Sequence, residues 1–431
     1  MARRCGMSNF AFQSSYPEPF GISLANSRVD APKMMTAVYL VSLFLFDNSI
    51  VYQVALLLAA GSILLFDRGW MKSQITPLIY SFGLLFVYFF FHTFLGFTQT
   101  PSASISKLIG MITTFISICS VAYILQSRRC FDFVMDVIIC IGIFFALYAV
   151  FVLKSDVFVD TAWNTVPKPF LSGETYAHND LPTVFAFSLF FLRYKLLKPI
   201  DKSGVLRCFQ WLLIILFLCL TVLSGARKGL ICAAFGLIVF PILCTGERKS
   251  FAIKTVAILA VLTMFFIAVL NIDFLYNSIG YRFDAILHGL AGGDYTEGSA
   301  RYRDMIASYA WVSISKKWIV GYGLNSFGQL SGFGGWAENG YLDLWFSGGL
   351  IAVVIFVSFY LYAIVKLYGQ SPRSIETILY LVLTIWFLIN NSMTVAYSSR
   401  ILLLISCFIS SFLTVSCPDS RTCDFNNNSI E

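Results

Sequence analysis

Residues 131–153 read FDFVMDVIICIGIFFALYAVFVL, an apolar run whose only charged residues, Asp132 and Asp136, stand near its beginning. A run of this length can cross the hydrocarbon core of a bilayer as one α-helix, because about 20 apolar residues are sufficient. Similar runs cover residues 34–47, 49–66, 75–95, 105–126, 180–197, 209–224, 229–245, 251–270, 341–365, 375–391 and 399–415. The sequence therefore predicts an all-α, polytopic integral membrane protein with about 12 transmembrane helices.

The composition supports this fold class. Of the 431 residues, 58% are hydrophobic and 12% are charged, whereas roughly 25% of an ordinary soluble domain is charged. So few charges cannot cover a soluble surface, which excludes a soluble enzyme, a nucleic-acid-binding protein and a disordered chain. The formal net charge of +7 is accordingly divided between the two sides of a membrane, where cytoplasmic loops collect Lys and Arg.

The positions of Lys and Arg predict the orientation of the chain. They are concentrated in the N-terminal tail and in short connections such as residues 193–207, which places both termini in the cytoplasm. The first apolar run begins only after Pro32, so no cleavable signal peptide is expected. The predicted organisation is a cytoplasmic tail (1–33), helices one to five (34–153), an outer loop (154–179), helices six to nine (180–270), a large outer loop (271–340), helices ten to twelve (341–415) and a cytoplasmic tail (416–431).

The cysteines and histidines give no sign of a metal site or a disulfide framework. None of the 11 cysteines lies in either outer loop, and no CxxC spacing occurs. The three histidines, His92, His178 and His288, are far apart in the sequence. We therefore expect neither a metal nor another cofactor.

Two basic segments stand on the outer side, against the usual bias. Arg227 and Lys228 lie in LSGARKGL, at a predicted outer turn between two helices. Arg301 and Arg303 lie in SARYRDMIASYAW, at the start of a helix predicted over residues 301–319. Cations at a helix N-terminus oppose the helix dipole, which indicates a bound anion or an acidic partner. Side chains that reach the lipid headgroups, or that are simply solvated, are the alternatives.

The third segment, WAENGYLDLWFSGGL, contains Glu338 just before a predicted membrane helix. Its carboxylate can act as a general base at the outer mouth, or it can simply cap the helix. Asp343, one turn deeper, is a competing acid because ionisable residues inside membrane helices are usually functional. Arg400, at the outer start of the last helix, is expected to join the anion site.

Taken in order, the segments LSGARKGL, GSARYRDMIASYAWVSISKKWIVGYGLNSF and AENGYLDLWFSGGL resemble the O-antigen ligase and polymerase superfamily of bacterial surface-polysaccharide assembly. The resemblance covers mainly residues 215–360. It implies a glycosyltransferase-C-like fold in the bacterial inner membrane, with short helices in the large loop and both outer loops in the periplasm. It also implies transfer of a glycan from undecaprenyl pyrophosphate without a metal or a nucleotide sugar.

The resemblance assigns roles by position. Arg227 and Arg301 would bind the pyrophosphate, since the guanidinium fork matches phosphate oxygens, and Glu338 would take a proton from the acceptor hydroxyl. Further substrate-binding residues are expected at Lys228, Arg303, Asn339, Tyr341, His178 and Arg400. Ligases of the superfamily have a His-Asn pair where this chain has Glu338-Asn339. The change favours a polymerase acting on its own repeat unit, or it means that His178-Asn179 supplies the base.

Three functions remain open at this point. The first is a polymerase of O-antigen, capsule or exopolysaccharide repeat units, and the second is a ligase that transfers the glycan to lipid A core or another acceptor. The third is a transporter or flippase, although transport sites usually lie near the bilayer midplane and these charges gather at one mouth. The expected partners are an undecaprenyl-pyrophosphate-linked oligosaccharide, the bilayer, a chain-length regulator and a flippase, and no nucleic acid is expected.

Overall fold

A computed structural model describes most of the chain. The described residues are 30–46, 50–66, 75–127, 130–158, 166–168, 180–198, 203–244, 298–370 and 374–416 without Ala396 and Ser398, together with single positions between 256 and 284. Within them the regular structure is helical, and no strand occurs.

The helices follow the predicted apolar runs. They are α1 (Ala31–Leu45), α2 (Ile50–Phe66), α3 (Pro77–Phe94), α4 (Pro101–Ser127), α5 (Phe131–Leu153), α6 (Asp180–Leu197), α7 (Gly204–Leu223), α8 (Arg227–Ala234), α9 (Phe240–Cys244), α13 (Gly298–Lys316), α14 (Phe327–Ser331), α15 (Gly340–Gly369), α16 (Ile375–Asn391) and α17 (Arg400–Ser416). A π-helical turn, Phe235–Val239, joins α8 to α9. Every predicted run except 251–270, which lies largely outside the described residues, overlaps one of these helices.

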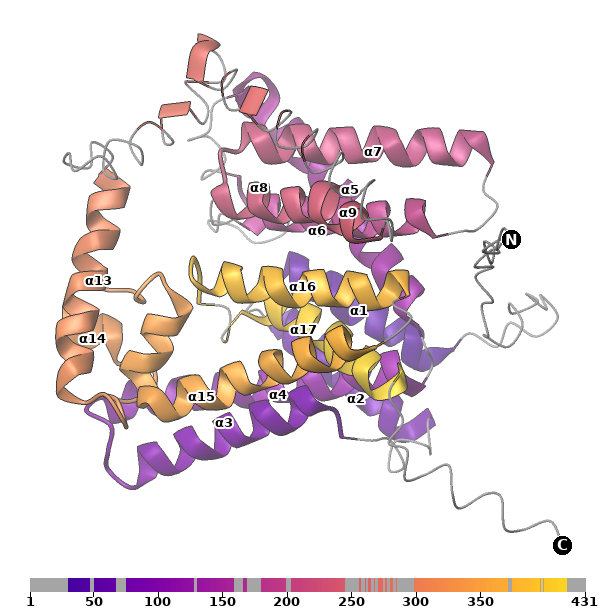
Figure 1. Ribbon diagram of the computed structural model, residues 1–431. Coiled ribbons are helices and arrows are strands. Elements are labelled where there is room, and N and C mark those ends of the chain that lie inside the picture. Colours follow the sequence, from indigo (N-terminus) through magenta and orange to yellow (C-terminus); the bar gives the residue numbers. More distant parts are fainter. Residues whose placement is uncertain are drawn as a thin grey trace, which may run out of the picture.

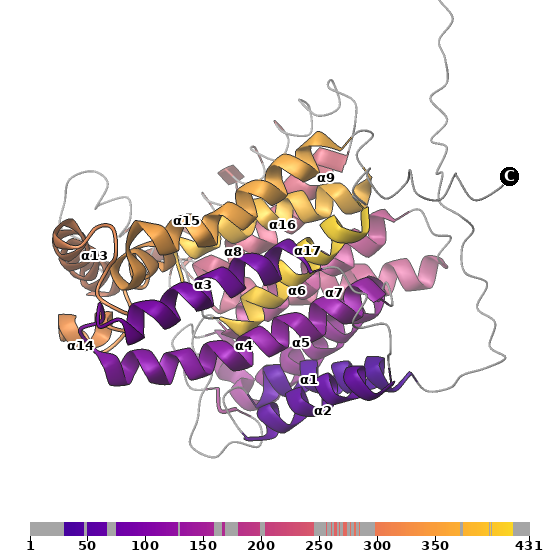
Figure 2. The same cartoon turned by 90° about the horizontal axis from the view of Figure 1, so that it is seen from below.

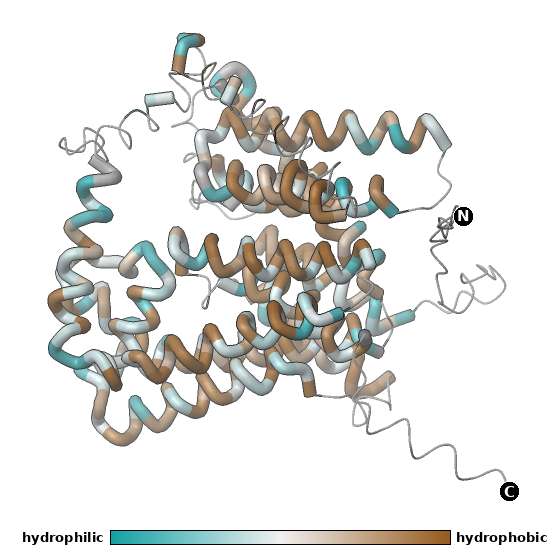
Figure 3. The backbone as a smooth tube through the Cα atoms, in the orientation of Figure 1, coloured by the Kyte–Doolittle hydropathy of each residue, from teal (hydrophilic) through white to brown (hydrophobic). Residues whose placement is uncertain are grey.

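The composition of the helices confirms the all-α, polytopic membrane fold. Among the described helices, α3, α4, α5, α7 and α15 are long and apolar enough to cross a membrane, and shorter apolar helices accompany them. On α3, apolar side chains are buried on one side, as at Leu85 and Phe89, and exposed on the other, as at Leu84 and Phe91. A helix that is apolar all round is typical of a membrane span. Figure 3 shows hydrophobic residues, in brown, recurring along the helices of the bundle.

The starts of several helices are fixed by polar residues in the sequence. Thr76, Ser203, Asn339 and Ser374 stand immediately before α3, α7, α15 and α16, and each side chain accepts a hydrogen bond from a backbone N–H in the first turn. Such caps satisfy donors that have no partner within the helix. The local sequence thus sets where these apolar segments begin.

Most helices run along a common direction, and α13 lies across one end of them (Figure 1). In the second view, α13 is seen nearly end-on while α3, α4 and α15 extend away from it (Figure 2). We call this the α13 end of the bundle. The short helix α14 lies at the same end, so the continuously described part of the large polar loop, residues 298–340, packs against the ends of the membrane helices.

A break in α15 anchors α13 to the bundle. Gly349 has a left-handed backbone conformation (φ 65°, ψ −169°) inside α15, and the segment that follows α13 packs into the break. The Leu350 N–H donates to the Trp318 carbonyl (2.9 Å), and the Gly323 N–H donates to the Ser347 carbonyl (2.8 Å). Backbone groups that the break removes from the helix ladder are satisfied in this way, as a low-dielectric environment requires.

Candidate active site

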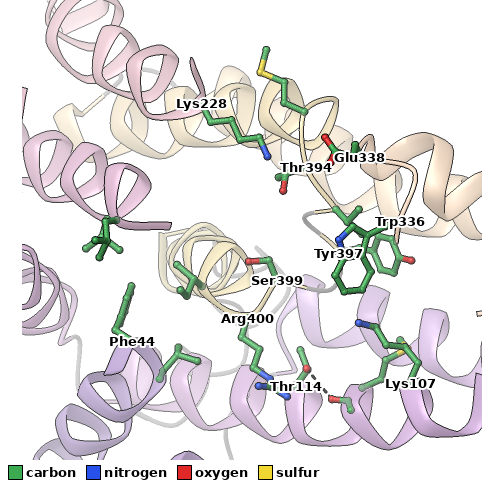
Figure 4. Close-up of a pocket in the computed structure, with 18 of the residues that line it drawn as sticks. Phe44, Lys107, Thr114, Lys228, Trp336, Glu338, Thr394, Tyr397, Ser399 and Arg400 are labelled. Carbon is green, nitrogen blue, oxygen red and sulfur yellow. Dashed lines mark hydrogen bonds between the residues drawn. The ribbon is translucent and has the colours of Figure 1, made fainter. Parts of the chain in front are cut away.

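A cavity of about 520 Å³ lies at the α13 end of the bundle. Its walls come from the end of α1, from α3 to α6, from the first turns of α8 and α17, and from α13. The segment 166–168 and the loops that precede α15 and α17 complete them. Figure 4 shows Lys228 and Lys107 pointing into it from two of these helices. Residues that are distant in the sequence therefore meet in one chamber.

Several helices begin at this cavity. Leu181 of α6, Lys228 of α8 and Arg400 of α17 line it from the first turns of their helices, and Glu338 lines it two residues before α15 begins. The N-terminus of a helix carries roughly half a positive charge from its aligned peptide dipoles. Helix ends that converge in this way favour a negatively charged ligand.

The charged side chains of the cavity point to the same kind of ligand. The basic lining residues are Lys107, Lys168, Lys228, Arg303 and Arg400. Glu338 is the carboxylate among the described lining residues. The remaining wall is partly apolar, with Leu43, Phe44, Phe82, Phe145, Leu181 and Val184. The cavity therefore suits a ligand that combines an anionic group with a less polar part.

Glu338 is held by its backbone and by an ion pair. Its φ is 55°, a left-handed conformation that residues with a side chain rarely adopt and that is often retained at functional sites. The Arg303 Nε donates to Glu338 Oε2 at 2.8 Å, so α13 fixes one carboxylate oxygen. Among the described residues, no hydrogen bond reaches the other oxygen, Oε1, which remains open to a ligand.

Asn339, rather than Glu338, caps α15. The Asn339 side-chain oxygen accepts from the backbone N–H groups of Tyr341 (3.0 Å) and Leu342 (3.2 Å). The cap interpretation of Glu338 is therefore wrong, because its neighbour performs that role. Asn339 thereby fixes the entry into α15 directly after the cavity carboxylate.

Asp343 supports the cavity from behind. It is buried, and the Tyr397 hydroxyl donates to its Oδ2 (2.5 Å) while the Ala337 N–H donates to its Oδ1 (3.2 Å). Burial raises the pKa of the Tyr397 hydroxyl well above its ordinary value, so this group stays protonated and donates. Asp343 thus ties the loop before α15 to the loop before α17.

The cavity cations stand at two depths. Lys107 lies over the Trp336 ring, 5.1 Å from its centroid. The Arg400 guanidinium lies 4.6 Å from the Tyr52 ring centroid and donates to Thr113 Oγ1 at 3.4 Å. Lys107 and Thr113 are both on α4, and the rise per residue separates them by about 9 Å along the helix. Arg400 therefore reaches the deeper part of the bundle, while Lys107 stands nearer the α13 end.

The structure brings together four of the residues expected from the sequence: Glu338, Lys228, Arg303 and Arg400. Arg301 is exposed on α13 and is not among the lining residues. The backbone of Arg227 opens α8, but its side chain lies outside the described part of the chain.

The other expected site residues do not line the cavity or lie outside the described residues. The Tyr341 hydroxyl donates to the Leu388 carbonyl at 2.7 Å, which ties α15 to α16. His178 and Asn179 lie outside the described residues. The roles expected for Asn339, Tyr341, His178, Arg227 and Arg301 stay predictions.

The sequence analysis missed two basic residues of the cavity, Lys107 and Lys168. Lys107 is a cation in the otherwise apolar run 105–126, which is itself a sign of function. Lys168 stands between Pro167 and Pro169 in an outer loop, and its sequence context gives no comparable signal. In the part of the chain that the structure describes, no three His, Cys, Asp or Glu side chains form a group that could hold a metal ion.

The comparisons with known proteins agree with the resemblance seen in the sequence. A family model described as O-antigen ligase matches residues 212–357, a stretch from α7 into α15 that includes Lys228, Arg303 and Glu338. No curated protein matches the chain. The family match does not distinguish ligases from polymerases. The match of residues 212–357 to this family model supports a place for the polytopic membrane protein in the O-antigen ligase and polymerase superfamily.

Proposed function

We propose that the protein polymerises lipid-linked polysaccharide repeat units of O-antigen, capsule or exopolysaccharide. The growing glycan leaves undecaprenyl pyrophosphate and joins a new lipid-linked unit at the periplasmic face of the inner membrane. The observation that carries this proposal is the meeting of one carboxylate, several cations and converging helix N-termini in a single cavity. The orientation with both termini in the cytoplasm belongs to the same proposal.

The reaction uses the two kinds of charge in different ways. Glu338 Oε1 takes the proton of the acceptor hydroxyl as the oxygen attacks the anomeric carbon of the donor glycan. The bond from that carbon to the pyrophosphate oxygen breaks, and the electron pair leaves with the pyrophosphate. Lys228, Arg400 and the helix N-termini stabilise the charge that develops there. The resemblance assigns the same part to Arg227 and Arg301, although Arg301 is exposed and does not line the cavity.

Arg303 has a different part in this mechanism. Its Nε holds Glu338 Oε2, so it sets the direction in which Oε1 faces. A base held in one orientation reacts faster because it does not search for the productive geometry. Arg303 is thus primarily a positioning residue for the base.

The test is a reconstituted reaction with a single substrate, one repeat unit on undecaprenyl pyrophosphate, and no other acceptor. A ladder of products on a gel is expected from the wild-type protein, and none from Glu338→Gln. Glu376→Gln is the matched control, because Glu376 lies in the first turn of α16, whereas the cavity is reached just after the last turn of that helix. Glu376 accepts a hydrogen bond from the Tyr194 hydroxyl (3.1 Å), and an amide oxygen can still accept that bond. A Glu338→Gln protein that makes a normal ladder contradicts the assignment of the base.

A ligase is the second candidate, because the matching family is described as O-antigen ligase. The Glu338-Asn339 pair in place of His-Asn favours the polymerase. Transfer only after lipid A core is added would replace the polymerase with the ligase. A transporter is the third candidate, and against it stands the position of Glu338, Arg303 and Lys107, which line the cavity at the α13 end of the bundle. The flippase and chain-length regulator of the same pathway remain proposed partners.

A further inference from the structure

A second groove, of about 340 Å³, lies between the end of α3 and the segment that follows α13. Its lining is Phe97, Lys316, Lys317, Trp318, Ile319, Val320 and Gly321. It shares no lining residue with the larger cavity. The proposed reaction therefore does not explain it.

The length of α15 places this groove at a membrane boundary. Beyond the break at Gly349, α15 runs from Leu350 to Gly369, which is about 29 Å at the helical rise per residue. That length matches the roughly 30 Å thickness of the hydrocarbon core. The Leu350 N–H donates to the Trp318 carbonyl (2.9 Å), so Trp318 lies at the level where the hydrocarbon ends on the α13 side.

Helix α3 gives the same depth independently. It runs from Pro77 to Phe94, about 26 Å at the helical rise, and Phe97 follows three residues later. The His92 Nε2 forms a hydrogen bond with the Val320 carbonyl oxygen at 2.9 Å, which joins this end of α3 to the groove. Two helices thus place the groove at the depth of the lipid headgroups.

The groove is continuous with the lipid-facing surface. Phe91 and Phe94 of α3 are exposed, and so are Phe97, Trp318 and Ile319 in the groove itself. Tryptophan at this depth is typical of the aromatic belt of membrane proteins. Apolar side chains thus lead from the groove down to the level of the acyl chains.

Two lysines give the groove its charge. Lys316 is exposed, and the Lys317 Nζ lies over the Tyr322 ring, 5.0 Å from its centroid. No acidic residue is among the described residues that line the groove. The dipole of α13 favours cations at its C-terminal end, but it does not account for a hollow walled by Trp318 and Phe97 beside them. An ammonium pair above an apolar wall complements a phosphate joined to acyl chains.

We infer that this groove binds an anionic glycerophospholipid of the surrounding bilayer, with the phosphate between Lys316 and Lys317 and the acyl chains along α3 and α15. The occupant follows from the charge of the lysines and from the continuity with the lipid-facing surface. Because the segment that forms the groove also fills the break in α15, the lipid would brace the base of α13.

The test is native mass spectrometry of the full-length protein in detergent, with phosphatidylglycerol or phosphatidylcholine of identical acyl chains added. Wild-type protein is expected to hold phosphatidylglycerol about 30-fold more strongly, given the usual contribution of two lysines near a membrane surface. The Lys316→Gln/Lys317→Gln protein is expected to lose this preference. Lys154→Gln, at an exposed lysine on another outer segment, is the matched control and keeps it.

A second pair of measurements guards against a folding defect in the double variant. Lys316→Arg/Lys317→Arg keeps both charges and is expected to keep the preference, and added salt is expected to weaken it in the wild type. Equal binding of the two lipids by wild-type protein overturns the inference, as does unchanged binding by the Gln variant. Displacement of phosphatidylglycerol by equimolar undecaprenyl phosphate also overturns it and assigns the groove to the carrier lipid. All these readouts are independent of polymerase activity.

Discussion

At the scale of single residues, Glu338 combines a strained backbone with a functional side chain. Glu338→Gly relieves a left-handed conformation that costs about 1–3 kcal/mol and loses an exposed ion pair worth about 0–1 kcal/mol. Glycine also adds about 0.5–1 kcal/mol of unfolded-state entropy. The expected result is a melting temperature equal to or above the wild-type value together with complete loss of the product ladder. A destabilised but active variant would show that the strain has no link to catalysis.

Arg301 and Arg303 offer a direct comparison between family resemblance and geometry. Arg303 lines the cavity and holds Glu338, whereas Arg301 is exposed. Arg303→Gln is expected to lower kcat about 100-fold, because a misplaced base costs about that much. Arg301→Gln is expected to lower it much less, because Arg301 is exposed and does not line the cavity. Single-turnover rates with the lipid-linked unit provide the measurement. A larger loss at Arg301 would favour the role that the resemblance assigns to it.

Tyr397 tests the support behind the cavity. Tyr397→Phe leaves Asp343 Oδ2 buried without its donor, and a buried acceptor left unsatisfied costs about 1–3 kcal/mol. We expect the free energy of unfolding, measured by SDS-induced unfolding, to fall by about 1–3 kcal/mol, with a lower midpoint. Tyr302→Phe is the control, because the Tyr302 hydroxyl donates to the Phe333 carbonyl at an exposed position where water can replace it. Equal midpoints for the two variants would contradict the bracing role of Asp343.

At the scale of helices, the break in α15 depends on glycine. A Cβ at Gly349 would overlap the Ile319 carbonyl oxygen, and the φ of 65° is unfavourable for any other residue. Gly349→Ala is therefore expected to detach the base of α13 and to reduce the yield of monodisperse protein in size-exclusion chromatography. Gly61→Ala is the control, since Gly61 lies within α2 with no atom within 4 Å of an added Cβ. Its yield is expected to equal or exceed the wild-type yield.

The break also shows what the sequence could and could not predict. Hydropathy located the membrane helices because every backbone group in a bilayer needs an internal partner, which leaves few alternatives to a helix. It predicted 341–365 as one uninterrupted helix. The sequence Gly348-Gly349 alone does not distinguish a break from a helix interior, because the partner that fills the break, residues 317–323, lies elsewhere in the chain.

The candidate site, like the fold, could be predicted from the sequence only in part. Lys228 and Arg303 were expected from basic segments that stand against the usual charge bias, and Glu338 and Arg400 from their places at the outer starts of membrane helices. The cavity contains all four. Lys168 was missed because it reaches the cavity only through the path of a loop, which no local pattern encodes. The choice between Arg301 and Arg303 depends on the rotation of α13 about its axis, which is set by packing.

At the scale of the whole molecule, the helix directions make the proposed orientation testable. Helix α15 begins beside the cavity, and Lys366 lies in its last turn. Helix α6 also begins at the cavity, and Lys195, paired with Asp136 at the far end, lies about 21 Å further along. Cysteines placed at 195 and 366 should therefore face the cytoplasm, and cysteines at 316 and 336, on the exposed surface of the α13 end, should face the periplasm.

A membrane-impermeant maleimide, applied to cells with a permeabilised outer membrane, separates these positions. Labelling at 316 and 336 alone is expected, with 195 and 366 reacting only after the inner membrane is opened. The wild-type chain measures the background from its native cysteines, most of which lie in apolar segments. Labelling at 195 and 366 in cells with an intact inner membrane would show that the protein has the opposite orientation. It would place the cavity on the side where the proposed periplasmic polymerisation does not occur, so this measurement decides the orientation on which the proposal depends.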